Sequence, residues 1–292
     1  MRRDVEYGVA NGKRLLLDAY VPTDGSSRRP AVVLIHGGGF RAGDKASFEP
    51  EARKLVERKG WVAFSINYRL DETAAFPAEV EDVQAAVRWI RANARDYRVD
   101  PTRIGALGES AGAHLAAMLA TLGEGDRDDG ARIEAAVSWS GPMDLTALAR
   151  QRGDAWGVPL MGCSLAACPD KFAQFSPITH VDGSDAPLSL INSTNELVPL
   201  AQAEAMASRI EDAQGITQVQ RLDGARHALD YRDEVWNPTE LFLAKFIDPP
   251  AKTSIGTVVF AVTVLVVVAL AGVAVLRRQR TQVERPILRV RT

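Results

Sequence analysis

The sequence predicts an α/β fold in which a mainly parallel central sheet carries helices on both faces. Short, largely apolar runs such as 31–35 and 61–66 alternate along the chain with segments of helical periodicity. Strands buried on both faces of a parallel sheet read as continuous apolar runs, and their alternation with helices indicates βαβ units. Polar or glycine-rich segments follow several of these runs, and binding sites in such sheets form at the carboxyl ends of the strands.

The first half of the fold is expected to begin with a hairpin. Residues 5–21 alternate apolar and polar side chains around an Asn-Gly pair, a strong signal for a two-residue hairpin turn. A helix is expected over 47–59, because Gly60 ends a stretch of helical spacing. A longer helix is expected over 76–94, where apolar residues recur at helical spacing.

The second half continues the alternation. Asp100-Pro101 is expected to form a turn before the next strand. The remaining strands are expected at 104–107, 133–140, 187–191 and 218–222, and the remaining helices directly after Ser110, at 200–213 and at 234–247.

The 292 residues suffice for one domain of roughly 250 residues and an appendage. Residues 255–276 contain no charged side chain and would span about 33 Å as a helix, against about 30 Å for the hydrocarbon core of a bilayer. We therefore expect a folded domain over 1–248, a linker over 249–254, a transmembrane helix over 255–276 and a basic tail over 277–292. The net charge of −2 gives no indication of a nucleic-acid partner.

The basic tail predicts the orientation in the membrane. It carries six arginines against one glutamate, and positively charged flanks remain in the cytoplasm. This predicts a single-pass protein of the cell membrane, in contact with lipid through 255–276, with its folded domain outside the cytoplasm. Residues 1–6 contain no apolar export segment, which leaves two explanations open. Either an upstream signal is missing from this chain, or the protein is tail-anchored with its domain in the cytosol.

The centre of the chain contains a candidate nucleophile. A short apolar strand over 104–107 runs into Gly108-Glu109-Ser110-Ala111-Gly112, and an Ala/Leu-rich helix follows at once. Strand, G-x-S-x-G and helix together form the context of a nucleophile elbow, in which Ser110 takes a strained conformation at a sharp turn. Glycines on both sides let strand and helix pass close together. The alternative is a helix N-cap serine between two unrelated glycines.

A second glycine-rich segment follows the strand at 31–35. It reads His36-Gly37-Gly38-Gly39-Phe40, and three successive glycines free the backbone to turn its N–H groups toward a ligand. In the HGGG arrangement, this loop and the residue after the nucleophile form an oxyanion hole. We assign this role to Gly38, Gly39 and Ala111. A phosphate-binding loop is disfavoured because neither of the usual glycine patterns for phosphate is present.

A serine nucleophile needs a base, and His227 is the natural candidate. It follows the last predicted strand, and the chain order serine, acid, histidine is the one expected with a nucleophile elbow. His36 is expected to be structural. His114 lies four residues after Ser110 on the same helix, so we expect it to face back toward the site. The four histidines show no metal-ligand spacing, and no metal or cofactor is expected.

Four segments together resemble a known family. HGGGF at 36–40, GESAG at 108–112, Ser-Gly-Pro at 140–142 and GARHA at 224–228 look like the α/β-hydrolase esterases of the hormone-sensitive-lipase and feruloyl or xylan esterase-like group. The resemblance covers about residues 5 to 247. It implies an α/β-hydrolase fold and a serine carboxylesterase that cleaves short or medium acyl esters, of lipid or glycan type, through an acyl-enzyme. The substrate would be a small-molecule ester, and the oligomeric state stays open.

The acid position departs from the family pattern. Relatives carry Asp-x-x-Val-Pro after the penultimate strand, and here Val198-Pro199 places Asn195 where the Asp belongs. Asparagine can orient a histidine but cannot offset its positive charge. Glu196 has a longer side chain, and we expect it to be the triad acid, with Asn195 as the alternative. This departure keeps a catalytically weak binding or scaffold domain open, and a serine peptidase of the same fold is the third reading.

The segment over 141–185 lacks clear periodicity, and we expect a lid-like insert that covers the site and sets specificity. It contains both cysteines, Cys163 and Cys168, whose spacing alone leaves a small disulfide loop and free thiols open. The resemblance implies the disulfide, because secreted or anchored relatives carry a similar lid.

Overall fold

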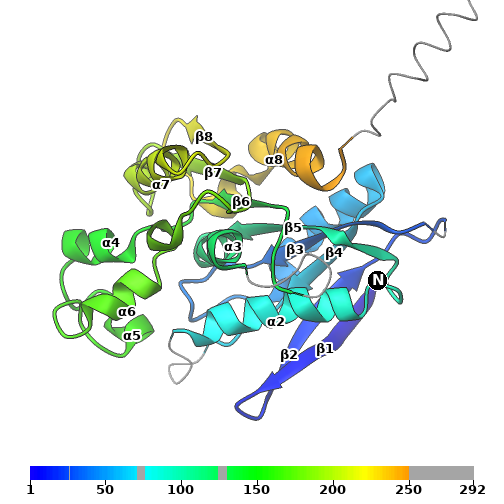
Figure 1. The fold of residues 1–292 in the computed structure, drawn as a ribbon, viewed down its shortest axis with the longest axis horizontal. Helices are drawn as coiled ribbons and strands as arrows, with labels where there is room; N and C mark the ends of the chain where they lie inside the picture. Colours follow the sequence, from blue (N-terminus) through cyan, green and yellow to red (C-terminus); the bar gives the residue numbers. More distant parts are fainter. Residues whose placement is uncertain (26, 71–75, 124–129, 250–292) are drawn as a thin grey trace, which may run out of the picture. The chain divides into compact units, whose positions relative to one another are not determined.

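The computed structural model describes residues 1–25, 27–70, 76–123 and 130–249 (Figure 1). The predicted membrane span over 255–276 and the basic tail over 277–292 lie outside the described residues. Within the described ranges, no helix is both long and apolar enough to cross a bilayer.

These residues build a sheet of eight strands in the order β1-β2-β4-β3-β5-β6-β7-β8 (Figure 1). β2 is antiparallel to both of its neighbours, β1 and β4, whereas the other neighbouring pairs are parallel. The predicted α/β fold with a mainly parallel sheet is therefore confirmed. The strands are β1 (Arg2–Ala10), β2 (Lys13–Tyr20), β3 (Arg29–Ile35), β4 (Val62–Ile66), β5 (Val99–Glu109), β6 (Ala135–Trp139), β7 (Leu188–Ser193) and β8 (Thr217–Leu222).

The hairpin between β1 and β2 turns where the sequence predicts it. Asn11 and Gly12 both have positive φ, 50° and 74°. A two-residue turn of this kind needs positive φ at both central positions, which asparagine and glycine tolerate best.

The turn expected at Asp100-Pro101 is wrong, because β5 runs through both residues. The pairing of β3 with β5 passes from Val99 directly to Ile104, with a register shift between them. Pro101 therefore lies where the ladder is interrupted and its missing N–H leaves no gap in the pairing. Thr102 instead donates from its N–H and its hydroxyl to the Asp100 carboxylate.

Helices cover both faces of the sheet, as predicted. One apolar core packs the sheet against α2 (Ala78–Ala92), α3 (Ala111–Leu122) and α7 (Leu200–Asp212). A second core packs the other face against α1 (Glu49–Lys54) and α8 (Arg232–Ile247). The helix expected over 47–59 is divided between turns of different type, η1 (Lys45–Phe48), α1 and η2 (Leu55–Lys59), and Gly60 ends it with a φ of 66°.

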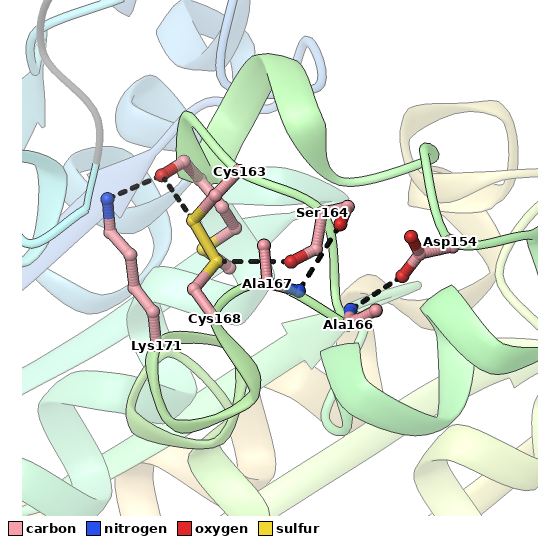
Figure 2. Close-up of a disulfide and its surroundings, with 8 residues drawn as sticks. Asp154, Cys163, Ser164, Ala166, Ala167, Cys168 and Lys171 are labelled. Carbon is pink, nitrogen blue, oxygen red and sulfur yellow. Dashed lines mark hydrogen bonds between the residues drawn. A yellow bond between two sulfur atoms is a disulfide. The ribbon is translucent and has the colours of Figure 1, made fainter.

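The segment over 141–185 folds into short helices that Figure 1 shows grouped at one side of the sheet. A disulfide joins Cys163 and Cys168 between the second and third of them (Figure 2). Lys171, labelled in the same close-up (Figure 2), donates from Nζ to the Met161 carbonyl, which connects the two helices a second time. The helices are α4 (Leu145–Arg152), α5 (Val158–Met161), α6 (Pro169–Gln174) and η3 (Pro177–His180).

Candidate active site

Ser110 occupies the turn between β5 and α3. Its backbone has φ 51° and ψ −116°, a conformation that costs energy for any residue with a side chain. Glycine is required on both sides of Ser110 because other parts of the backbone pass very close to these positions. A Cβ at Gly108 would lie 2.1 Å from the Gly112 carbonyl oxygen, and a Cβ at Gly112 would lie 2.0 Å from the Ile35 carbonyl oxygen. The chain therefore makes a strained strand-to-helix turn that presents the serine at the end of the sheet.

His227 and Glu196 complete a chain of hydrogen bonds with the serine. His227 Nε2 lies 3.0 Å from Ser110 Oγ, and His227 Nδ1 lies 2.5 Å from Glu196 Oε2. With Nδ1–H donating to the carboxylate, Nε2 is free to accept the serine proton. The Glu196 side chain is fully buried, and its other oxygen accepts from the Ser193 N–H at 2.7 Å. The bond from Ser193 therefore holds the Glu196 carboxylate in place beside the imidazole.

Asn195 takes no part in this chain. Its side chain is exposed and its Nδ2 lies 3.4 Å from Thr194 Oγ1, while its N–H donates to the Gly224 carbonyl. The structure therefore brings Glu196, the residue with the longer side chain, against His227 and turns Asn195 toward solvent.

The glycine loop after β3 folds back on itself beside Ser110. Gly38 and Gly39 have φ values of 108° and 63°, and the N–H groups of Arg41 and Ala42 donate to the Gly38 carbonyl. Ala111 is the first residue of α3, where backbone N–H groups have no partner within the helix. These are the three donors that the sequence assigns to an oxyanion hole, and all three residues line the same cavity as Ser110.

That cavity has a volume of about 360 Å³. Part of its wall comes from the segment over 141–185, through Leu148, Trp156 and Leu160. Leu197 and Val198, from the loop that carries Glu196, lie on the wall as well. The lining is therefore mainly apolar, as that of small-molecule sites commonly is, and Ser110, Arg41 and Arg152 are its polar side chains.

His36 and His114 are both buried behind the site. His36 Nδ1 contacts the Gly37 carbonyl at 2.7 Å, its ring stacks on Tyr68, and burial lowers its pKa. His114 does not face Ser110 as expected. Its Nδ1 contacts the Pro142 carbonyl at 2.8 Å, and burial lowers its pKa to about 4. On this helix the i+4 position points into the core.

Sequence reasoning missed Glu109, which it treated as the variable position of G-x-S-x-G. Its Oε1 accepts from the Gly37 N–H at 2.6 Å, and burial raises its pKa. A carboxylate at the end of the buried run 104–109 needs a partner, and this requirement was the available signal.

The loop that carries His227 is anchored by a network that sequence reasoning also missed. Ser140 Oγ accepts from the Ala228 N–H at 2.9 Å and lies 2.7 Å from the Tyr231 hydroxyl. That hydroxyl also contacts the Ile191 carbonyl. The histidine loop is thereby tied to the ends of β6 and β7. Within the ranges that the structure describes, no three His, Cys, Asp or Glu side chains are grouped to hold a metal ion.

Comparisons with known proteins place this geometry in context. Residues 17–210 match the model of the family described as BD-FAE. Esterase LipQ of Mycobacterium tuberculosis is 32% identical over 245 residues, which are 78% of this chain and 57% of that protein. The probable carboxylic ester hydrolase LipM of the same organism is 27% identical, over 70% of this chain and 50% of its own. The chain thus spans about half the length of these relatives.

Solved structures agree with the fold. A thermophilic esterase from Thermogutta terrifontis, Est2, superposes with a TM-score of 0.72 at 25% identity, covering 87% of this chain and 95% of its own. A truncated carbohydrate esterase from gut microbiota superposes with a TM-score of 0.69 at 25% identity, covering 82% of this chain and 94% of its own.

Proposed function

The chain belongs to the BD-FAE family and has an α/β-hydrolase esterase fold, and on this premise we propose that it is a serine carboxylic ester hydrolase. The observation that carries the proposal is the hydrogen-bonded series Glu196, His227, Ser110, with separations of 2.5 and 3.0 Å. A serine hydroxyl is a weak nucleophile without a base, and this series supplies one that is oriented by a buried carboxylate.

The reaction would proceed through an acyl-enzyme. Ser110 Oγ attacks the ester carbonyl while His227 Nε2 takes its proton, and Glu196 stabilises the imidazolium that results. The N–H groups of Gly38, Gly39 and Ala111 would hold the oxyanion. His227 then protonates the departing alcohol and activates a water molecule, which releases the acid and restores the serine.

We propose short or medium acyl esters as substrates, because the mainly apolar cavity of about 360 Å³ suits a small chain. A Thermogutta terrifontis Est2 structure with butyrate bound supports this range, and the gut carbohydrate esterase supports a glycan ester as one option. The proposed setting is a membrane surface, with the domain outside the cytoplasm, as the apolar run over 255–276 and the basic tail suggest. A disulfide is compatible with such an oxidising compartment.

The direct test measures para-nitrophenyl acetate and butyrate hydrolysis by the full chain and by Ser110→Ala. We expect turnover on the order of 1 s⁻¹ or more that the substitution abolishes. A fluorophosphonate probe should label the unaltered chain at Ser110 and leave the variant unlabelled. A folded chain that neither hydrolyses esters nor reacts with the probe would instead favour a binding or scaffold function.

A further inference from the structure

Two arginines lie in the wall of the cavity that contains Ser110. Arg41 follows the glycine loop, and Arg152 is the last residue of α4. The described residues that line the cavity include no Asp or Glu to neutralise them. The cavity thus combines an apolar wall with two positive charges.

Arg152 is held in place by contacts that leave its charge available. Its guanidinium donates from Nη2 to the Leu197 carbonyl and lies over the Trp156 ring, 5.5 Å from the ring centroid. A guanidinium has five N–H donors, so this bond leaves others free for a ligand. The residue also ends a helix, where the macrodipole favours a cation.

Arg41 is positioned by the oxyanion loop itself. Its N–H donates to the Gly38 carbonyl at 3.2 Å, which ties its backbone to the turn beside Ser110. Within the described part of the chain, neither Arg41 nor Arg152 forms an ion pair. By contrast, Arg69 elsewhere in the fold is paired with the buried Asp82 at 2.8 Å.

We propose that this site prefers esters that carry an anionic group, of the carboxylate class, on the part of the ester that occupies this cavity. Arg41 and Arg152 are the specificity-determining residues. Both side chains are exposed at the mouth of the cavity, and a planar guanidinium matches a carboxylate through paired N–H donors. This inference rests on the proposed esterase function and narrows its substrate class.

The test compares matched esters with the full chain and has two arms. In the first, the anion is in the acyl part, and para-nitrophenyl hemiglutarate is compared with para-nitrophenyl valerate. In the second, it is in the alcohol part, and para-carboxyphenyl butyrate is compared with para-carbamoylphenyl butyrate. We expect the anionic ester to have a kcat/KM about tenfold higher in one arm, which corresponds to about 1.4 kcal/mol. The arm that shows the preference identifies which part enters the cavity.

Substitutions then test whether Arg41 and Arg152 cause the preference for anionic esters. Arg41→Gln and Arg152→Gln should each lower the anionic-to-neutral ratio of kcat/KM, and the double variant should bring it close to one. Arg150→Gln is the matched control, because Arg150 is exposed on the same helix and does not line the cavity. Raising the salt concentration should reduce the ratio in the unaltered chain. A ratio of one or less in both arms, or a preference that survives the double variant, overturns the inference.

The outcome is separable from that of the esterase proposal. If the chain hydrolyses the neutral esters without any preference, the inference fails and the proposed function stands. If it hydrolyses no ester, the proposed function fails, and the inference is tested by calorimetry with glutarate monoamide against valeramide. Stronger binding of the anionic amide that the double variant removes would support the arginine site, and equal binding would overturn it.

Discussion

Glu109 and Gly37 are joined across 72 positions of sequence by a hydrogen bond of 2.6 Å from the glycine N–H to the carboxylate. Glu109 precedes the nucleophilic turn at the end of β5, and Gly37 begins the glycine loop after β3, the neighbouring parallel strand. A Cβ at Gly37 would lie 2.5 Å from Glu109 Oε2, so a larger residue here would displace the carboxylate from this bond. The bond therefore fixes the glycine loop relative to Ser110.

Removing this bond should reduce turnover more than substrate binding. We expect Glu109→Ala to lower kcat roughly tenfold or more with little change in KM, because displaced donors lose transition-state stabilisation. Glu109→Gln should recover much of the loss, since its amide oxygen can still accept from Gly37. Steady-state kinetics on para-nitrophenyl butyrate distinguishes these effects. A change in KM alone, or equal losses in both variants, would contradict a positioning role.

The acid of the proposed triad can be identified by two adjacent substitutions. Glu196→Gln should lower kcat by about 10³ to 10⁴, because the amide no longer stabilises the imidazolium. Asn195→Ala should change kcat less than about twofold, as its side chain is exposed and remote from His227. The measurement is kcat at pH 8 with both variants checked by circular dichroism. A larger loss in the Asn195 variant would reverse the assignment.

The Cys163–Cys168 disulfide should stabilise the wall of the cavity. It closes a loop of sequence separation 5 between α5 and α6, and α5 carries Leu160 on the cavity wall. Replacing both cysteines by serine should lower the free energy of unfolding by about 2 kcal/mol. Urea denaturation measures this, and dithiothreitol should reproduce the loss in the unaltered chain but have no effect on the variant. Identical unfolding curves for both chains would show that the disulfide does not stabilise the folded state.

Glu79 should make stability depend on pH. It is 2% exposed, its Oε2 has no hydrogen-bond partner among the described residues, and burial raises its pKa from 4.5 to about 7. Between these values the folded chain retains a proton that the unfolded chain has released. The free energy of unfolding should therefore fall as pH rises through this window, by about 3 kcal/mol in all.

Glu79→Gln should remove most of this decline, because the neutral amide has no proton to lose. The measurement is urea denaturation at pH 5 and pH 8. Glu57→Gln, at an exposed position, serves as the control and should keep the decline. If all three chains show the same pH dependence, titratable groups other than Glu79 cause the decline in the free energy of unfolding.

Local motifs explain why much of the site could be predicted from sequence. The glycines around Ser110 and the Asn11-Gly12 turn reflect backbone conformations that only certain residues tolerate, so they appear directly in the sequence. The choice between Asn195 and Glu196 is different. It depends on the turn in which Glu196 reaches back to the Ser193 N–H, and on where β8 places His227, and sequence spacing records neither.

The segment over 141–185 was the least predictable part for a physical reason. Its helices contain between four and eight residues, too few turns for an apolar period to emerge. His114 was misplaced because helical spacing says which residues share a face, but not which face packs inward. Here Phe40 and Phe175 contact its ring and place that face in the core.

The separation of Ser110 from His227 by 117 positions also affects when, during synthesis, the site can be assembled. During synthesis, the nucleophilic turn and the glycine loop emerge well before the two strands that deliver the acid and the base. A nascent chain can therefore complete most of its sheet and still lack Glu196 and His227. The proposed ester cleavage would require β8 to be paired with β7, so activity regained on refolding would report that this last-synthesised strand is in place.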